Sequence, residues 1–170
     1  MLAIESLVGG AGGDVFNGIQ NGLAIDGSTG VDTLSLSALD GPGLINLNTG
    51  RVTTSGSTMS LSGIESAVGT KGADTFVGDA SDNLFQGGAG TDTADYDVAA
   101  RAVVFTLGSD SAVTVVGAST FANIGTDTLQ SIENLQGSEP KGGRHDGGGG
   151  HAHIAAVEFV DRQRALLLHR

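Results

Sequence analysis

Aspartates recur at a fixed interval in two parts of the chain. Asp14 and Asp32 are 18 residues apart, and Asp74 and Asp92 repeat the same spacing. Each aspartate follows a glycine-rich stretch, and glycine allows a backbone to adopt positive φ and bring its carbonyl oxygens close to an ion. Carboxylate and carbonyl oxygens together suit a hard cation that accepts 6 to 8 ligands at roughly 2.3–2.6 Å. The residue types and spacing therefore predict Ca²⁺ binding.

These aspartates lie in nine-residue units that each begin with glycine. Three consecutive units cover residues 9–35 and three more cover 69–95, at an offset of 60 residues. The last unit, 87–95, reads GGAGTDTAD and fits the nonapeptide GGxGxDxUx, which is typical of parallel β-helices, with Ala94 as the apolar U. The sixth residue is aspartate in the first and third unit of each triplet, but it is not aspartate in the second.

The nine-residue period predicts how the aspartates are arranged. If each unit is a turn of about six residues followed by a short strand, successive turns fall on opposite sides of a flattened coil. Units one and three then share a side, with Asp14 over Asp32 and Asp74 over Asp92 at the parallel-strand spacing of ~4.8 Å. The opposite side of each triplet carries the sixth residue of the middle unit and is expected to bind weakly or not at all.

The predicted Ca²⁺ ligands are the four carboxylates together with the carbonyls of the first and third residues of the same turns. They are Gly9, Ala11, Asp14, Gly27, Thr29, Asp32, Gly69, Lys71, Asp74, Gly87, Ala89 and Asp92. Without metal, stacked carboxylates would lie roughly 5 Å apart, so the apo chain should be expanded and metal binding should supply folding free energy. The alternative is that the aspartates cap turns by accepting hydrogen bonds from backbone amides.

Further candidate ligands remain open. They are Asp79, Asp82, Asp127 and the histidines His145, His151 and His153. Imidazoles two residues apart can share a transition metal, but these histidines lie in a glycine-rich stretch that is typical of a flexible linker. The recurring glutamates Glu5, Glu65 and Glu133 are expected to have a structural role at a repeated turn rather than a catalytic one.

An apolar residue occupies the eighth position of every unit, which predicts that this position faces the core. These residues are Phe16, Ile25, Leu34, Phe76, Phe85 and Ala94.

A longer repeat surrounds the triplets. The phrase at 3–9 recurs at 63–69 and 131–137, and the alternating stretches at 43–48 and 103–107 predict strands.

The pattern as a whole predicts an all-β fold, a right-handed parallel β-roll or β-helix (a solenoid) built from two related units of about 60 residues. We assign residues 1–136 to this calcium-binding roll, with units 3–62 and 63–130, and residues 137–170 to a Gly/His-rich linker and tail. In the tail, a mild helical pattern from Ile154 to Arg170 predicts an irregular or short helical extension. It would cap the coil, dock on a partner or be foreign sequence.

Composition narrows the function classes. Residues 1–136 carry 15 Asp and Glu against three Lys and Arg, so the predicted roll should attract cations and repel nucleic acid and anionic membranes. The absence of Cys excludes disulfides and thiolate metal sites. No apolar run approaches the ~18 residues of a membrane span, and the first ten residues lack the features of a signal peptide. Secretion would need another export route.

The nonapeptides and the phrase from Tyr96 to Leu135, with GTDTLQSIENL at 125–135, resemble the haemolysin-type calcium-binding (RTX) repeat family over residues 3–137. The resemblance implies a parallel β-roll that folds on binding Ca²⁺ outside the cell after type I secretion from Gram-negative bacteria. Such modules are appended to toxins, proteases, lipases, epimerases, adhesins and surface-layer proteins.

We therefore expect a non-catalytic calcium-binding module of a secreted or cell-surface bacterial protein, because the sequence contains no constellation for nucleophilic catalysis. One alternative is an adhesin or surface-layer repeat that self-associates with calcium or binds surface polysaccharide through exposed strands at 44–54 and 103–116. Another is the tail or a fragment of a polysaccharide-acting β-helix enzyme (an epimerase or lyase) or of a secreted protease.

Overall fold

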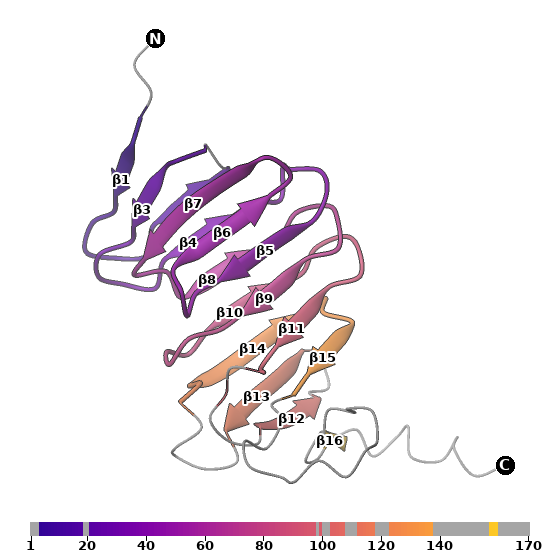
Figure 1. Cartoon of the computed structure of the whole chain (residues 1–170). Coiled ribbons are helices and arrows are strands. Elements are labelled where there is room, and N and C mark those ends of the chain that lie inside the picture. Colours follow the sequence, from indigo (N-terminus) through magenta and orange to yellow (C-terminus); the bar gives the residue numbers. More distant parts are fainter. Residues whose placement is uncertain are drawn as a thin grey trace, which may run out of the picture.

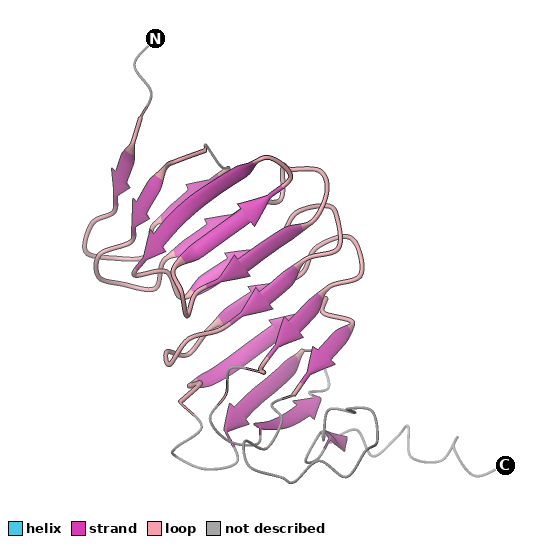
Figure 2. Cartoon of the chain, viewed as in Figure 1, coloured by secondary structure: helices cyan, strands magenta, loops and turns pink. Residues whose placement is uncertain are grey.

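A computed structural model of the chain describes residues 4–18, 21–97, 99, 103–107, 112–117, 123–137 and 157–159. These residues form short strands joined by turns, and none of them lies in a helix (Figure 2). The all-β prediction is therefore confirmed for this part of the chain. Accordingly, the described residues contain no long apolar helix that could cross a membrane.

Most strands are only three residues long, as the nonapeptide pattern predicts. The described strands are β1 (Ser6–Val8), β2 (Val15–Asn17), β3 (Ala24–Asp26), β4 (Thr33–Ser35), β5 (Gly43–Asn46), β6 (Arg51–Thr54), β7 (Ser57–Ser62), β8 (Ser66–Val68), β9 (Thr75–Val77), β10 (Leu84–Gln86), β11 (Thr93–Asp95), β12 (Val103–Leu107), β13 (Val113–Gly117), β14 (Thr126–Gln130), β15 (Asn134–Gln136) and β16 (Val157–Phe159).

The strands form two eight-stranded sheets. Sheet 1 has the order β1-β3-β7-β6-β5-β9-β11-β15, and sheet 2 has the order β16-β12-β13-β14-β10-β8-β4-β2. Successive nonapeptide strands alternate between the sheets and pair in parallel with the strand two units away, as β2 does with β4 and β9 with β11. Figure 1 shows the resulting stack of rungs, which extends from β1 to the end where β12 and β16 lie. This arrangement is consistent with a β-roll or another solenoid-like fold.

The middle residue of each short nonapeptide strand points into the core between the sheets. Leu34, Phe76, Phe85 and Ala94 are fully buried, and Ile25 is nearly so. The rings of Phe76 and Phe85 contact each other across the two sheets, with their centroids 5.1 Å apart. The predicted inward position is thus confirmed at these five residues.

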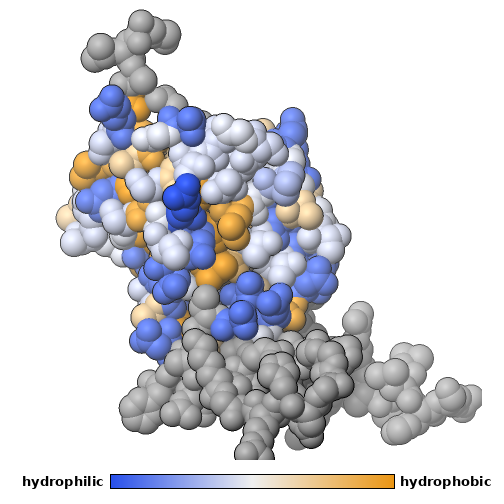
Figure 3. All heavy atoms as spheres, viewed as in Figure 1, coloured by the Kyte–Doolittle hydropathy of each residue, from blue (hydrophilic) through white to orange (hydrophobic). Residues whose placement is uncertain are grey.

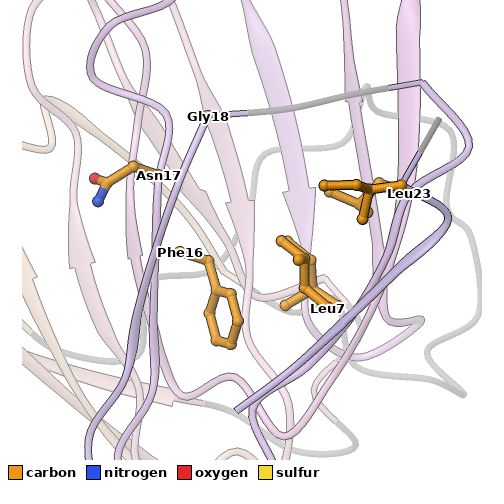
Figure 4. Close-up of a pocket in the computed structure, with 7 residues that line it drawn as sticks. Leu7, Phe16, Asn17, Gly18 and Leu23 are labelled. Carbon is orange, nitrogen blue, oxygen red and sulfur yellow. The ribbon is translucent and has the colours of Figure 1, made fainter. Parts of the chain in front are cut away.

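The sixth such residue, Phe16, is only half-buried because its strand lies at the end of sheet 2. Together with Leu7 and Leu23 it lines a half-open apolar cavity at the β1–β2 end of the stack (Figure 4). Ile4 and Val8 are also exposed at this end. Elsewhere, the face drawn in Figure 3 carries mainly neutral and hydrophilic side chains with small apolar patches.

Two antiparallel insertions interrupt the parallel stack. Strands β5, β6 and β7 form one insertion in sheet 1, and β12, β13 and β14 form the other in sheet 2. The strands predicted at 43–48 and 103–107 are confirmed at 43–46 and 103–107. Their inward faces are covered, since Ile45, Val52 and Phe105 are fully buried, whereas Leu44 of β5 remains exposed. The first insertion is also paired on both sides, with β3 and β9.

The tail departs from the helical prediction. Val157 lies in β16, which pairs in parallel with β12 and places Val157 opposite Phe105. The helical pattern is therefore wrong at this residue. The rest of the predicted helix at 154–170 and the histidines His145, His151 and His153 lie outside the described residues.

Candidate functional site

The predicted aspartate pairs stack on neighbouring rungs and are joined by hydrogen bonds. The backbone amide of Asp14 donates to Oδ1 of Asp32 at 2.7 Å, and the amide of Asp74 donates to Oδ1 of Asp92 at 2.8 Å. Parallel pairing of β2 with β4 and of β9 with β11 brings these turns together. The predicted stacking of each pair is therefore confirmed.

Each pair belongs to a longer series of hydrogen-bonded residues, which we call a ladder. The sheet 2 ladder runs through Asp14, Asp32, Glu65, Asn83 and Asp127. The first four lie at the turns that lead into strands of sheet 2, and Asp127 lies within β14 of the same sheet. The sheet 1 ladder runs through Asp74, Asp92 and Glu133, at the turns that lead into the strands of sheet 1.

The two aspartate pairs thus lie at the turns of different sheets. The equivalent strands β2 and β9, 60 residues apart in sequence, belong to sheet 2 and sheet 1 respectively. Asn83, which the sequence places on the opposite side from Asp74 and Asp92, consequently shares a ladder with Asp14 and Asp32.

Sequence reasoning missed the two glutamates as members of the ladders. Glu65 Oε2 accepts the Asp32 amide at 2.9 Å, and Glu133 Oε2 accepts the Asp92 amide at 2.8 Å. These carboxylates therefore repeat the role of the aspartates one rung further on. The signal that could have found them is the nine-residue spacing between Glu65 and Asp74.

The first aspartate of each pair is satisfied by its own turn. Oδ2 of Asp14 accepts the Gly10 amide at 2.6 Å, and Oδ2 of Asp74 accepts the Thr70 amide at 2.7 Å. The Thr70 hydroxyl and the Gly43 amide also donate to Asp74 Oδ1. At these two positions the carboxylates bond as the turn-capping alternative predicts.

The second aspartate of each pair is not satisfied. Asp32 and Asp92 are fully buried, and Oδ2 of each has no hydrogen-bond partner among the described residues. Their turns differ from the others at the second residue, because Ser28 and Gly88 have positive φ (70° and 97°), and the Ser28 amide donates to Asp26 instead. A buried carboxylate oxygen without a partner is costly, so both positions require an explanation.

A backbone carbonyl oxygen lies near each unpaired oxygen. A Cβ added to Gly27 would collide with the Gly63 carbonyl oxygen and lie 2.6 Å from Asp32 Oδ2. A Cβ added to Gly87 would collide in the same way with the Ser131 carbonyl oxygen and Asp92 Oδ2. The two sites therefore have the same composition: a carboxylate oxygen and a carbonyl oxygen from the next rung, packed around a glycine at which no side chain would fit.

The other predicted ligands lie in several different surroundings. The carbonyl oxygens of Gly27 and Gly87 lie near Asp14 Oδ2 and Asp74 Oδ2, around Gly9 and Gly69 respectively. The Gly9 carbonyl accepts the Ser28 hydroxyl, and the Thr29 carbonyl accepts the Gly12 amide. Ala11 pairs with Thr29, Ala89 is exposed, and Lys71 forms an exposed ion pair with Asp40 at 3.0 Å.

The surroundings of Asp92 shift its pKa. Burial raises the pKa of Asp92, and the Asp74 and Glu133 carboxylates act in the same direction, whereas the hydrogen bond from the Asp74 amide lowers it. Among the described residues, no three acidic or histidine side chains converge as a metal cluster. Any cation at Asp32 or Asp92 would therefore depend on backbone carbonyl oxygens for further ligands.

Asp127, an open candidate in the sequence, is buried but fully partnered. Its Oδ1 accepts the Asn83 amide at 2.9 Å, and its Oδ2 accepts the Tyr96 hydroxyl at 2.8 Å. Burial raises the pKa of Asp127 to about 7 and also raises the pKa of Tyr96. Asp79 and Asp82 bond backbone amides in nearby turns, those of Ser81 and Thr126.

A search against models of known protein families finds no match for this chain, and no curated protein is significantly similar to it.

Proposed function

We propose that this chain is a calcium-binding module of the haemolysin-type (RTX) kind, in which a right-handed parallel β-roll of two related units is stabilised by Ca²⁺. The observation that carries the proposal is a pair of buried carboxylate oxygens, at Asp32 and Asp92, that have no hydrogen-bond partner in the described part of the chain and lie near a carbonyl oxygen. A cation bound there would compensate the buried charge.

The chemistry of these oxygens favours calcium among the common cations. They are hard donors, and the roll has neither thiolates nor an imidazole in its predicted calcium turns. Ca²⁺ accepts irregular sets of carboxylates and carbonyls, whereas Mg²⁺ requires near-ideal octahedral geometry and retains its waters. The excess of acidic residues also raises the local concentration of cations.

We assign one site to each triplet, at its third unit. Asp32 with the Gly63 carbonyl would hold one ion, and Asp92 with the Ser131 carbonyl the other. The module would be non-catalytic and would act outside a Gram-negative cell after type I secretion, where calcium is plentiful enough to drive its folding.

Circular dichroism and calorimetry during a Ca²⁺ titration, with Mg²⁺ in parallel, test the proposal. We expect the full chain to gain β-structure and thermal stability with Ca²⁺ and to respond much less to Mg²⁺. As a matched control, Glu5→Gln removes one exposed carboxylate outside the predicted sites and should leave the response unchanged. A chain that is equally β-rich in EDTA and in millimolar Ca²⁺ would contradict calcium-dependent folding.

A further inference from the structure

Three buried carboxylates occupy equivalent places in the ladders. Asp32, Asp92 and Asp127 are all fully buried. In each of them, Oδ1 accepts the backbone amide of the preceding ladder residue, at 2.7, 2.8 and 2.9 Å respectively. The three differ at Oδ2, which is unpartnered in Asp32 and Asp92 but bonded in Asp127.

The partner of Asp127 is a buried tyrosine that is fixed in place. Tyr96 is 2% exposed, and its amide donates to the carbonyl of Gln136. Its ring packs edge-on against Phe105 with centroids 5.7 Å apart. The hydroxyl therefore reaches Asp127 from a well-defined position, and packing as well as the hydrogen bond maintains it.

Asp127 Oδ2 also lies beside a glycine and a second oxygen, although that oxygen is the Asn83 side chain, which accepts the Asp79 amide, and not a backbone carbonyl. A Cβ added to Gly78, the first residue of its unit, would lie 2.7 Å from Asn83 Oδ1 and 3.2 Å from Asp127 Oδ2. Two side-chain oxygens thus lie close to this glycine. Asp79 and Asp82 lie close enough to add negative potential at Asp127. Without the tyrosine hydroxyl, this environment would favour a cation.

We propose that the Tyr96 hydroxyl takes the place of a cation at Asp127, so that this third ladder carboxylate is closed to metal in the wild-type chain. The proposal rests on the proposed calcium-binding function and specifies its stoichiometry: two ions, at Asp32 and Asp92, and none at Asp127. It also identifies Tyr96→Phe as the change that opens a third site.

The physical reason is that the three Oδ2 atoms differ in whether they have a hydrogen-bond donor. The Tyr96 hydroxyl satisfies Asp127 Oδ2, whereas Asp32 Oδ2 and Asp92 Oδ2 have no such donor among the described residues. Tyr96→Phe removes one oxygen atom and retains the ring that packs on Phe105. Asp127 would then be left with a buried, unpartnered oxygen, like the other two.

The test is the number of Ca²⁺ ions bound per full-length chain, measured by equilibrium dialysis and calorimetry at pH 8 and again at pH 9, because burial raises the pKa of Asp127 to about 7 and loss of the Tyr96 hydrogen bond would raise it further. We expect two ions for the wild-type chain and three for Tyr96→Phe. The double variant Tyr96→Phe/Asp127→Asn, which removes the uncompensated charge, should return the count to two. Saturating Ca²⁺ should also raise the melting temperature of Tyr96→Phe by more than that of the wild type.

The outcomes separate the two proposals. A wild-type chain that binds no Ca²⁺ would contradict the proposed function itself. Two ions in both the wild type and Tyr96→Phe would overturn only the inference about Tyr96, as would a wild-type count of three. If Tyr96→Phe is unfolded in EDTA, the ions are counted after refolding in saturating Ca²⁺: three ions support the inference, whereas two ions or failure to refold overturn it.

Discussion

Gly27 and Gly87 pack directly against the two unpaired carboxylate oxygens, those of Asp32 and Asp92. Neither glycine is required by a positive φ, since the backbone at both positions has an ordinary conformation. They are required by space, because a side chain would occupy the region between the carboxylate and the carbonyl of the next rung. At these positions, the glycine-rich character of the turns therefore reflects close approach rather than backbone conformation.

Gly87→Ala should abolish one calcium site. Its Cβ would collide with the Ser131 carbonyl and Asp92 Oδ2, so we expect the bound Ca²⁺ to fall from two ions to one, with a loss of about 1–3 kcal/mol in the free energy of unfolding from overpacking. Dialysis measures the count, and urea unfolding measures the stability.

Gly10→Ala is the matched control for this change. A Cβ at Gly10 would be 3.8 Å from Asp14 Oδ2, in ordinary contact, and the calcium count should remain at two. Two ions bound by Gly87→Ala would show that the space around this glycine is not part of a site.

At the scale of single residues, the sequence predicted the stacking of Asp14 on Asp32 because a fixed period determines which turns are neighbours. It did not predict which carboxylate oxygens remain unpaired, because that depends on turn conformations at Ser28 and Gly88. It also did not predict the contact of Tyr96 with Asp127, which an insertion of variable length separates in the chain.

The short strands hold the fold together through their middle residues. A three-residue strand forms few hydrogen bonds, so its stability comes from packing of its inward side chain between the two sheets. Phe85 is the clearest case, since it is fully buried and contacts Phe76 from the opposite sheet.

Phe85→Ala should lower the free energy of unfolding by about 3–5 kcal/mol, because it removes a large buried side chain and leaves a cavity. Val15→Ala, at an exposed position of β2 (62% exposed), should change it by less than about 0.5 kcal/mol. Both values would be measured by urea unfolding in saturating Ca²⁺. Equal effects of the two substitutions would contradict the assignment of the eighth position as the core.

At the scale of elements, alternation in the sequence predicted the strands at 43–46 and 103–107, but their antiparallel insertions were not foreseen. The 60-residue repeat in the sequence does not reveal how many times the chain crosses from one sheet to the other. From β2 to β9 the chain crosses between the sheets five times, an odd number, so the equivalent aspartate pairs fall on the turns of different sheets. The helical pattern of the tail failed at Val157, where strand pairing with β12 takes precedence over weak periodicity.

Across the whole molecule, the two proposed calcium sites share no residue and belong to different ladders. Asp32→Asn and Asp92→Asn should therefore each reduce the count from two ions to one, and the double variant should bind none. Asparagine retains the Oδ1 acceptor for the amides of Asp14 and Asp74, so the ladders should persist. Loss of both ions in either single variant, measured by calorimetry, would show that the sites are not separate.

The end of the stack formed by β1 and β2 is expected to unfold before the rest of the described strands. Among the described strands, β1 and β2 each have a strand neighbour on one side only, and Phe16 at this end is only half-buried. In a stack of repeats, stability is approximately a sum of nearest-neighbour terms. A rung with only one neighbouring rung is therefore the least stable and unfolds first. Asp14 lies on the β2 rung, whereas Asp32 lies one sheet 2 strand further in. An ion at Asp32 would thus stabilise the β4 rung and limit local unfolding to β1 and β2.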